Sequence, residues 1–142
     1  MAGPTGTRRT GPGRLIIAVY AVFVVGSLSR AAFQIATKFD QAPLAYTLSA
    51  LAGVVYLAAT VALAVPGRRA WALAVATIGF ELAGVLVVGT WSLLRPDLFP
   101  DATVWSHYGR GYLFIPLVLP VVGLWWLRRT RPGLTTGSPP AR

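Results

Sequence analysis

The sequence predicts an all-α membrane protein, a bundle of four transmembrane helices with both termini in the cytoplasm. Three observations lead to this fold class. Of the 142 residues, 55% are hydrophobic and only 12% are charged, whereas soluble domains usually carry about 25% charged residues. The hydrophobic residues form long runs that are separated by short stretches with proline, glycine or charge. The basic residues, which give a net charge of +9, stand mainly beside the ends of those runs.

Four hydrophobic segments are each long enough for a hydrocarbon core of about 30 Å, which takes about 20 helical residues. They cover about residues 15–36, 42–65, 70–94 and 104–127. Pro66 and Gly67 end the second segment, and Arg95 and Pro96 end the third. Together they form one membrane domain over residues 14–128, between tails at 1–13 and 129–142. The tails are rich in Gly, Pro and Thr, a composition that predicts flexible cytoplasmic chain.

The basic residues are divided unevenly between the two sides that these segments define. One side carries nine: Arg8, Arg9, Arg14, Arg68, Arg69, Arg128, Arg129, Arg131 and Arg142. The other side carries four: Arg30, Lys38, Arg95 and Arg110. By the positive-inside rule, the first side is cytoplasmic, so both termini are inside a bacterial plasma membrane. A cleaved signal peptide in place of the first span is disfavoured, because Ser29-Arg30-Ala31 is a poor cleavage site.

One carboxylate, Glu81, lies near the midpoint of the third segment, within "TIGFELAGVL". An ionised side chain at the bilayer centre costs about 3 kcal/mol, so Glu81 is expected to face the bundle interior. Three interpretations stay open. Glu81 forms an ion pair with Arg30, or with Arg110, which is the leading expectation; it is protonated and hydrogen-bonded to Ser, Thr or Tyr; or it binds and releases a proton or cation during transport.

Small residues recur on the second and third segments at spacings that bring helices close together in lipid. They are Ala45, Ser49 and Gly53 on the second segment, and Gly79, Ala83, Gly84 and Gly89 on the third. Packing within the chain is the first interpretation, and a homodimer face is the second.

The loop before the fourth segment gathers polar side chains near the outer membrane face: His107, Tyr108, Asp97 and Asp101. A single histidine without a metal-binding spacing, in a chain without cysteine, predicts no metal site and no cofactor. The expected role is an interfacial belt with Arg110, between Gly109 and Gly111, turned inward. No catalytic residue is assigned; an enzyme acting on lipid through His107 is a distant third interpretation.

Two stretches, "FDQAPLAYTLSALAGVVYLAAT" and "DATVWSHYGRGYLFIPLVLPVVGLWWLRR", resemble a group of small four-span integral membrane proteins of actinobacteria. The resemblance covers about residues 15–129 and implies a membrane protein, without implying an activity.

These observations predict a protein without enzymatic activity, a structural or accessory component of a membrane assembly. Its partners are the lipid bilayer and either a second copy or another membrane protein. Nucleic acid is excluded as a partner, because the basic residues flank hydrophobic segments. The alternative is a small oligomeric transporter or channel that uses Glu81 as a proton or cation site.

Overall fold

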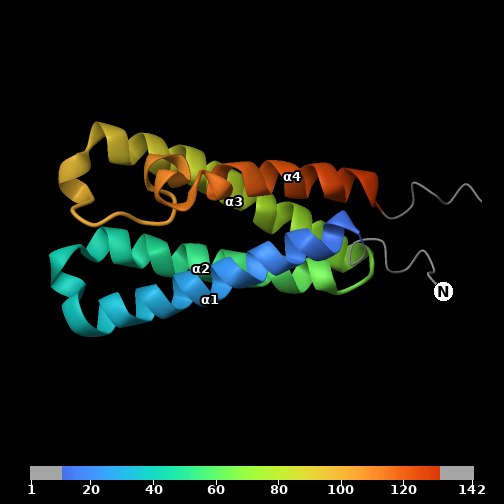
Figure 1. Ribbon diagram of the computed structural model, residues 1–142, viewed down its shortest axis with the longest axis horizontal. Coiled ribbons are helices and arrows are strands. Elements are labelled where there is room, and N and C mark those ends of the chain that lie inside the picture. The colour runs from blue at the N-terminus through green and yellow to red at the C-terminus, as the bar shows by residue number, and fades with distance from the viewer. Residues whose placement is uncertain (1–10, 132–142) are drawn as a thin grey trace, which may run out of the picture.

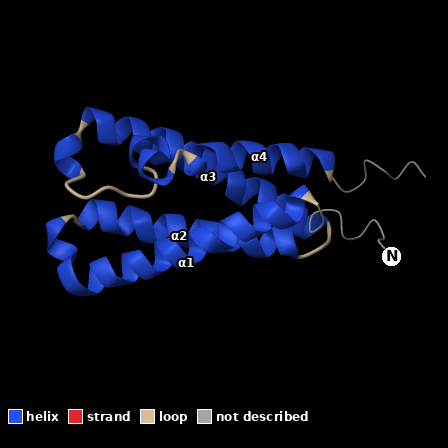
Figure 2. Cartoon of the chain, viewed as in Figure 1, coloured by secondary structure: helices blue, strands red, loops and turns tan. Residues whose placement is uncertain are grey.

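The computed structural model describes residues 11–131, and these residues form helices and turns without a β-strand (Figures 1 and 2). The long helices are α1 (Pro12–Lys38), α2 (Pro43–Ala64), α3 (Arg68–Leu94) and α4 (Ile115–Arg129). Three short 3₁₀ elements join them: η2 (Phe39–Gln41), η3 (Pro96–Leu98) and η4 (Ser106–Tyr112).

Three helices in this part of the chain are long and apolar enough to cross a membrane. They are α1 together with η2, α2 and α3, with mean hydropathies of 2.0, 1.9 and 2.1. η4 and α4 are long and apolar enough to cross a membrane only when they are taken together, and the chain bends by 97° between them. The described residues therefore hold three candidate spans, or four if the bent pair is one span.

Proline and glycine set the beginnings of the helices. Pro12, Pro43 and Pro116 lie in the first turns of α1, α2 and α4, where the missing proline N–H removes no helical hydrogen bond. Gly67, with φ of 116°, directly precedes α3 in a conformation that other residues rarely adopt. The bounds of α1, α2 and α3 lie within about three residues of the expected segments 15–36, 42–65 and 70–94.

The fourth expected segment, 104–127, is not one continuous helix. Residues 104–114 form turns and η4, and the α-helix begins only at Ile115. Left-handed backbone at Leu113 and Phe114 (φ 60° and 61°) separates the two parts, and right-handed helix cannot continue through such residues. Pro12 and Arg129, which were expected to belong to the two tails, lie in α1 and α4. Residues 1–10 and 132–142 of the expected tails lie outside the described chain.

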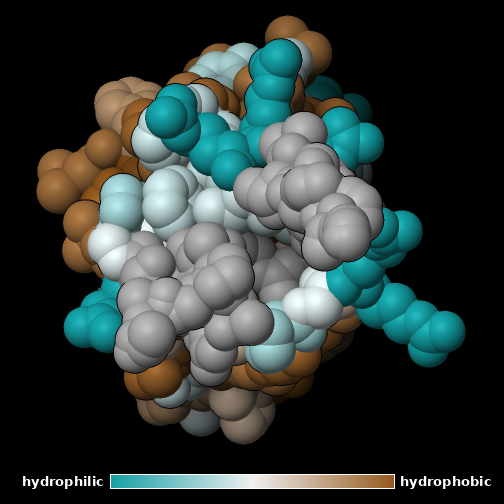
Figure 3. All heavy atoms as spheres, turned by 90° about the vertical axis from the view of Figure 1, so that its right-hand side faces the viewer, coloured by the Kyte–Doolittle hydropathy of each residue, from teal (hydrophilic) through white to brown (hydrophobic). Residues whose placement is uncertain are grey.

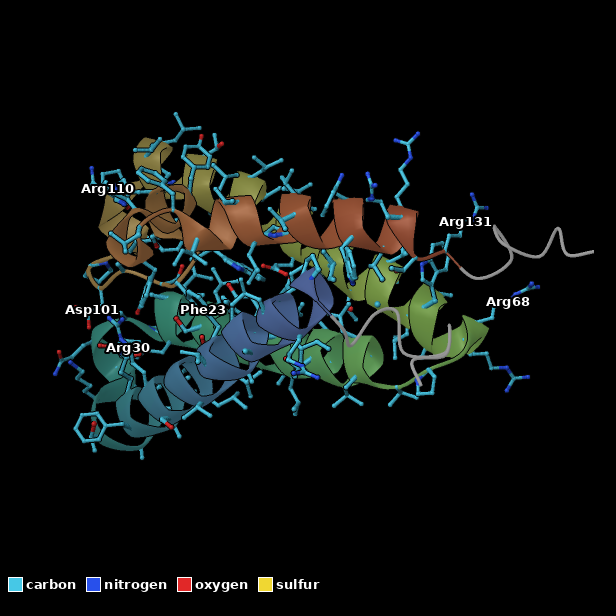
Figure 4. All side chains as sticks on the ribbon, turned by 45° about the vertical axis from the view of Figure 1, so that its right-hand side comes forward. Phe23, Arg30, Arg68, Asp101, Arg110 and Arg131 are labelled. Carbon is cyan, nitrogen blue, oxygen red and sulfur yellow. The ribbon has the colours of Figure 1, made fainter. Side chains whose placement is uncertain are left out.

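The helices pack side by side in chain order. α1 contacts α2, α2 contacts α3, and α3 contacts both α4 and η4, while α1 also reaches α4. Figure 1 shows that the start of α1 and the end of α4 lie at the same end of the molecule. Arg68 and Arg131 lie there, whereas Arg30, Asp101 and Arg110 lie at the opposite end (Figure 4). These two ends are called the Arg68 end and the Arg30 end below.

The interior is filled by aromatic and small side chains. Tyr20, Tyr46, Tyr56 and Ile78 are fully buried. Small residues of α2 let α1 approach closely: a Cβ added to Gly53 would lie 2.5 Å from Cδ2 of Leu28. The expected small residues of α2, namely Ala45, Ser49 and Gly53, are buried in the fold.

The outer surface of every long helix is hydrophobic. Val22 of α1, Val54 of α2, Leu94 of α3 and Val118 of α4 are each more than half exposed. Figure 3, which looks onto the Arg68 end, shows hydrophilic residues gathered on that end and hydrophobic residues around its rim. Exposed hydrophobic side chains on all four long helices are compatible with a membrane protein.

Candidate functional site

Glu81 lies on the buried stripe of α3, which also contains Ala74, Ile78, Val85 and Val88. Their spacing of three or four residues places all five on one face of the helix. The Glu81 side chain is fully buried. The hydroxyl of Tyr20 on α1 donates a hydrogen bond of 2.6 Å to its Oε1. Its other oxygen, Oε2, is buried and has no hydrogen-bond partner among the described residues.

An aromatic column connects this carboxyl with residues 103–114, the turns and η4 before α4, which we call the broken segment. We define the column as Tyr20, Tyr56 and Trp105, which are all fully buried or nearly so. The rings of Tyr20 and Tyr56 lie 6.1 Å apart between centroids, and those of Tyr56 and Trp105 lie 6.4 Å apart and edge-to-face. Trp105 Nε1 donates a 2.9 Å hydrogen bond to the Tyr56 hydroxyl. The column therefore joins α1, α2 and the segment before η4.

The expected ion pair between Glu81 and an arginine is not formed in the described chain. Arg30 instead donates through Nη1 to the hydroxyl of Tyr112, and Glu81 is bonded to Tyr20. The reason is position along α1. Arg30 lies ten residues after Tyr20, or about 15 Å farther along the helix axis, and it belongs to the Arg30 end (Figure 4). Arg110 also lies at that end.

Sequence reasoning did not identify Tyr20 as the partner of Glu81. A signal was present, because Tyr20 is the only residue with a polar side chain between Leu15 and Gly26. A lone hydroxyl in a hydrophobic run needs a partner once it is buried. Which residue that partner is depends on how α1 and α3 are aligned, and the local pattern does not determine this.

The four residues expected to form an outer polar cluster have different partners in the structure. Asp97 pairs with Arg95 through two hydrogen bonds, of 2.9 and 2.8 Å. Asp101 accepts from the Tyr46 hydroxyl and lies 3.7 Å from Lys38 Nζ. The described residues contain no group of three or more His, Asp or Glu side chains that could hold a metal.

His107 and Tyr108 belong to the broken segment, which forms hydrogen bonds with the C-terminal part of α3. The His107 amide donates to Ser92 Oγ at 3.0 Å, and the Tyr108 hydroxyl lies 2.7 Å from that of Thr90. Both residues have left-handed backbone, with φ of 54° and 61°. A non-glycine residue in this conformation costs about 1–3 kcal/mol, so contacts with α3 must hold it there.

The hydrogen bonds from Arg95 lower the pKa of Asp97, and Asp97 in turn raises the pKa of Arg95. Both side chains are more than half exposed, so solvent screens this pair. The pair neutralises two charges just beyond the end of α3.

A pocket of about 510 Å³ opens at the Arg30 end. Arg30 of α1 lines it together with five residues of the broken segment, namely Thr103, Ser106, His107, Arg110 and Tyr112. The pocket thus contains both arginines that were expected to pair with Glu81, and it holds His107 as well.

Comparison of the chain with protein-family models, curated proteins and solved structures finds no match.

Proposed function

We propose that this chain is a four-span integral protein of a bacterial plasma membrane, with both termini in the cytoplasm. The bent pair of η4 and α4 serves as the fourth span, and its hydrophobic exterior faces lipid or a membrane partner. The Arg68 end carries six of the described basic residues: Arg14, Arg68, Arg69, Arg128, Arg129 and Arg131. The Arg30 end carries four, and the positive-inside rule then places the Arg68 end in the cytoplasm.

This topology is testable with unique thiol labels, because the chain has no cysteine. Arg68 and Pro100 are exposed and lie at opposite ends of the molecule, and each is replaced by cysteine in one variant. In intact spheroplasts, an impermeant maleimide is expected to label Pro100→Cys and to leave Arg68→Cys unlabelled. After permeabilisation both variants should be labelled equally. Labelling of Arg68→Cys in intact spheroplasts would show that the orientation is the opposite of the one proposed.

Within the membrane, the function that the geometry supports best is a structural or accessory role without catalysis. The observation that carries it is the filled interior around Glu81. Glu81 and its partner Tyr20 are fully buried, and Tyr56 and Trp105 close the space toward the Arg30 end. The bond between Tyr20 and Glu81 connects α1 with α3, and a buried hydrogen bond of this kind holds two helices in one alignment.

A second function, transport of a proton or small cation, is favoured by a different observation. Glu81 Oε2 is buried and has no partner among the described residues, so it is an acceptor that a proton or ion could occupy. Trp105 of the column also belongs to the broken segment, and broken helices lie beside the sites of many transporters.

Two measurements on the same variants separate these roles. Glu81→Gln, Tyr20→Phe and the double variant are compared with the parent protein for thermal unfolding in mild detergent and for pH-driven flux in vesicles. If the bond is structural, the destabilisation of the double variant is smaller than the sum of the destabilisations of the two single variants. Flux then stays at background for every protein. A transporter predicts flux in the parent protein that is lost in Glu81→Gln while the fold is kept.

The accessory role also predicts a defined partner. Purification from cells in mild detergent is expected to yield the protein with a second membrane protein, or a second copy, at a fixed stoichiometry. A monomer that is stable and active in flux assays would contradict the accessory role.

A further inference from the structure

The pocket at the Arg30 end has a pronounced positive charge. Of the four cations at this end, Lys38 lies beside Asp101, and Arg95 is paired with Asp97. The other two, Arg30 and Arg110, have no carboxylate partner among the described residues, and both line the pocket. No aspartate or glutamate is among the residues that line it.

The two guanidinium groups reach the pocket from different elements. Arg30 projects from α1 and is held by its hydrogen bond to Tyr112, which leaves its other N–H groups free for a ligand. Arg110 stands in η4 between Gly109 and Gly111, and within the described chain it makes no hydrogen bond or salt bridge. Both side chains are exposed. Two planar donor groups in the lining of one pocket favour an anion with several oxygens, and guanidinium matches phosphate in geometry.

Two exposed hydrophobic side chains adjoin the lining of the pocket along the chain. Leu113 and Phe114, which directly follow the lining residue Tyr112, are 83% and 44% exposed. A pocket that joins cations to exposed hydrophobic side chains at the end of a helical membrane protein matches a phospholipid, whose phosphate lies directly above its acyl chains.

We infer that the pocket between Arg30 and Arg110 binds a phosphate-bearing anion, the headgroup of an acidic phospholipid. The two guanidinium groups contact the phosphate oxygens, and the acyl chains lie along Leu113 and Phe114. The pocket leaves room for a headgroup, at about 510 Å³. This site is independent of Glu81 and of either role proposed for it.

The test uses the full chain purified in a neutral detergent, with native mass spectrometry and thermal unfolding as readouts. Three probes are added separately: phosphatidylglycerol, zwitterionic phosphatidylcholine and inorganic phosphate. The variants are Arg30→Gln and Arg110→Gln. Arg95→Gln is the matched control, because it removes the same charge from the same end outside the pocket.

Phosphatidylglycerol is expected to bind and to raise the melting temperature. Each pocket variant should weaken that binding about tenfold, because each removes charge-assisted hydrogen bonds. Arg95→Gln should leave it unchanged, and phosphatidylcholine should bind more weakly than phosphatidylglycerol. Arg110→Gln keeps the experiment decisive if Arg30→Gln folds poorly, since Arg110 has no protein partner in the described chain.

If inorganic phosphate alone gives the full stabilisation, with the same dependence on Arg30 and Arg110, the site binds phosphate and its source is the free ion. The inference is overturned if none of the probes binds. It is also overturned if Arg95→Gln weakens binding as much as the pocket variants, because the effect is then one of net surface charge.

Discussion

Gly89 of α3 lies where the broken segment comes closest to the helix, and Gly89→Ala tests that contact. A Cβ at this position would lie 2.4 Å from Cδ1 of Tyr108 and 2.8 Å from its backbone nitrogen. Because one of these atoms is backbone, the clash is not relieved by rotating the tyrosine ring. Overpacking of this kind costs about 1–3 kcal/mol, while the change from glycine to alanine within a helix recovers about 1 kcal/mol.

Gly79→Ala is the matched control for this substitution. Gly79 lies ten residues earlier on the same helix, and a Cβ there would meet nothing within 4 Å. It should gain about 1 kcal/mol from helix propensity without a clash. The two variants should therefore differ by about 1–3 kcal/mol, the cost of the clash alone.

Thermal unfolding in detergent measures this difference. For a chain of this size, about 1 kcal/mol corresponds to a shift of about 4 °C. Gly89→Ala is therefore expected to melt about 4–12 °C below Gly79→Ala. Equal melting temperatures would refute the reasoning, because Tyr108 would then not be packed against α3 and the broken segment would lie elsewhere.

Two further predictions concern hydrogen bonds of the column and of the exposed pair. Trp105→Phe keeps an aromatic ring but removes the donor to Tyr56, so the buried Tyr56 hydroxyl loses its partner. Thermal unfolding should show that the free energy of unfolding falls by about 1–3 kcal/mol. An unchanged melting temperature would argue against that hydrogen bond. Arg95→Gln should raise the pKa of Asp97 toward its ordinary value, since the hydrogen bonds from Arg95 are the largest cause of the lowered pKa. Carboxyl ¹³C NMR titration measures this change. Because the folded pKa of Asp97 is depressed, its stabilising contribution is present above its unfolded pKa and is lost as the pH falls through the folded one.

The helices α1, α2 and α3 were predictable from the sequence because they depend on local properties. Each is a long hydrophobic run that begins or ends at proline or glycine, such as Pro43 and Gly67. The burial of Glu81 was also predictable, since the cost of exposing a charge to lipid does not depend on the rest of the fold.

The break before α4 and the partner of Glu81 were not predictable in this way. His107 and Tyr108 have left-handed backbone although neither is glycine, and their conformation depends on contacts with Ser92 and Thr90 of α3. The pairing of Tyr20 with Glu81 likewise depends on the alignment of two helices that are distant in sequence. Both features arise from tertiary contacts, which a pattern within one segment does not contain.

The shortness of α4 has a consequence for the surrounding bilayer. With 15 residues, α4 is about 22 Å long, while α1, with 27 residues, is about 40 Å long. A hydrocarbon core is about 30 Å thick, so the two helices mismatch it in opposite directions. In the proposed four-span topology, α1 is expected to accommodate its excess length by tilting, and lipid beside α4 is expected to thin or to meet the folded turns around Leu113. If the proposed four-span topology holds, the bilayer around this protein is therefore expected to be thinnest along α4.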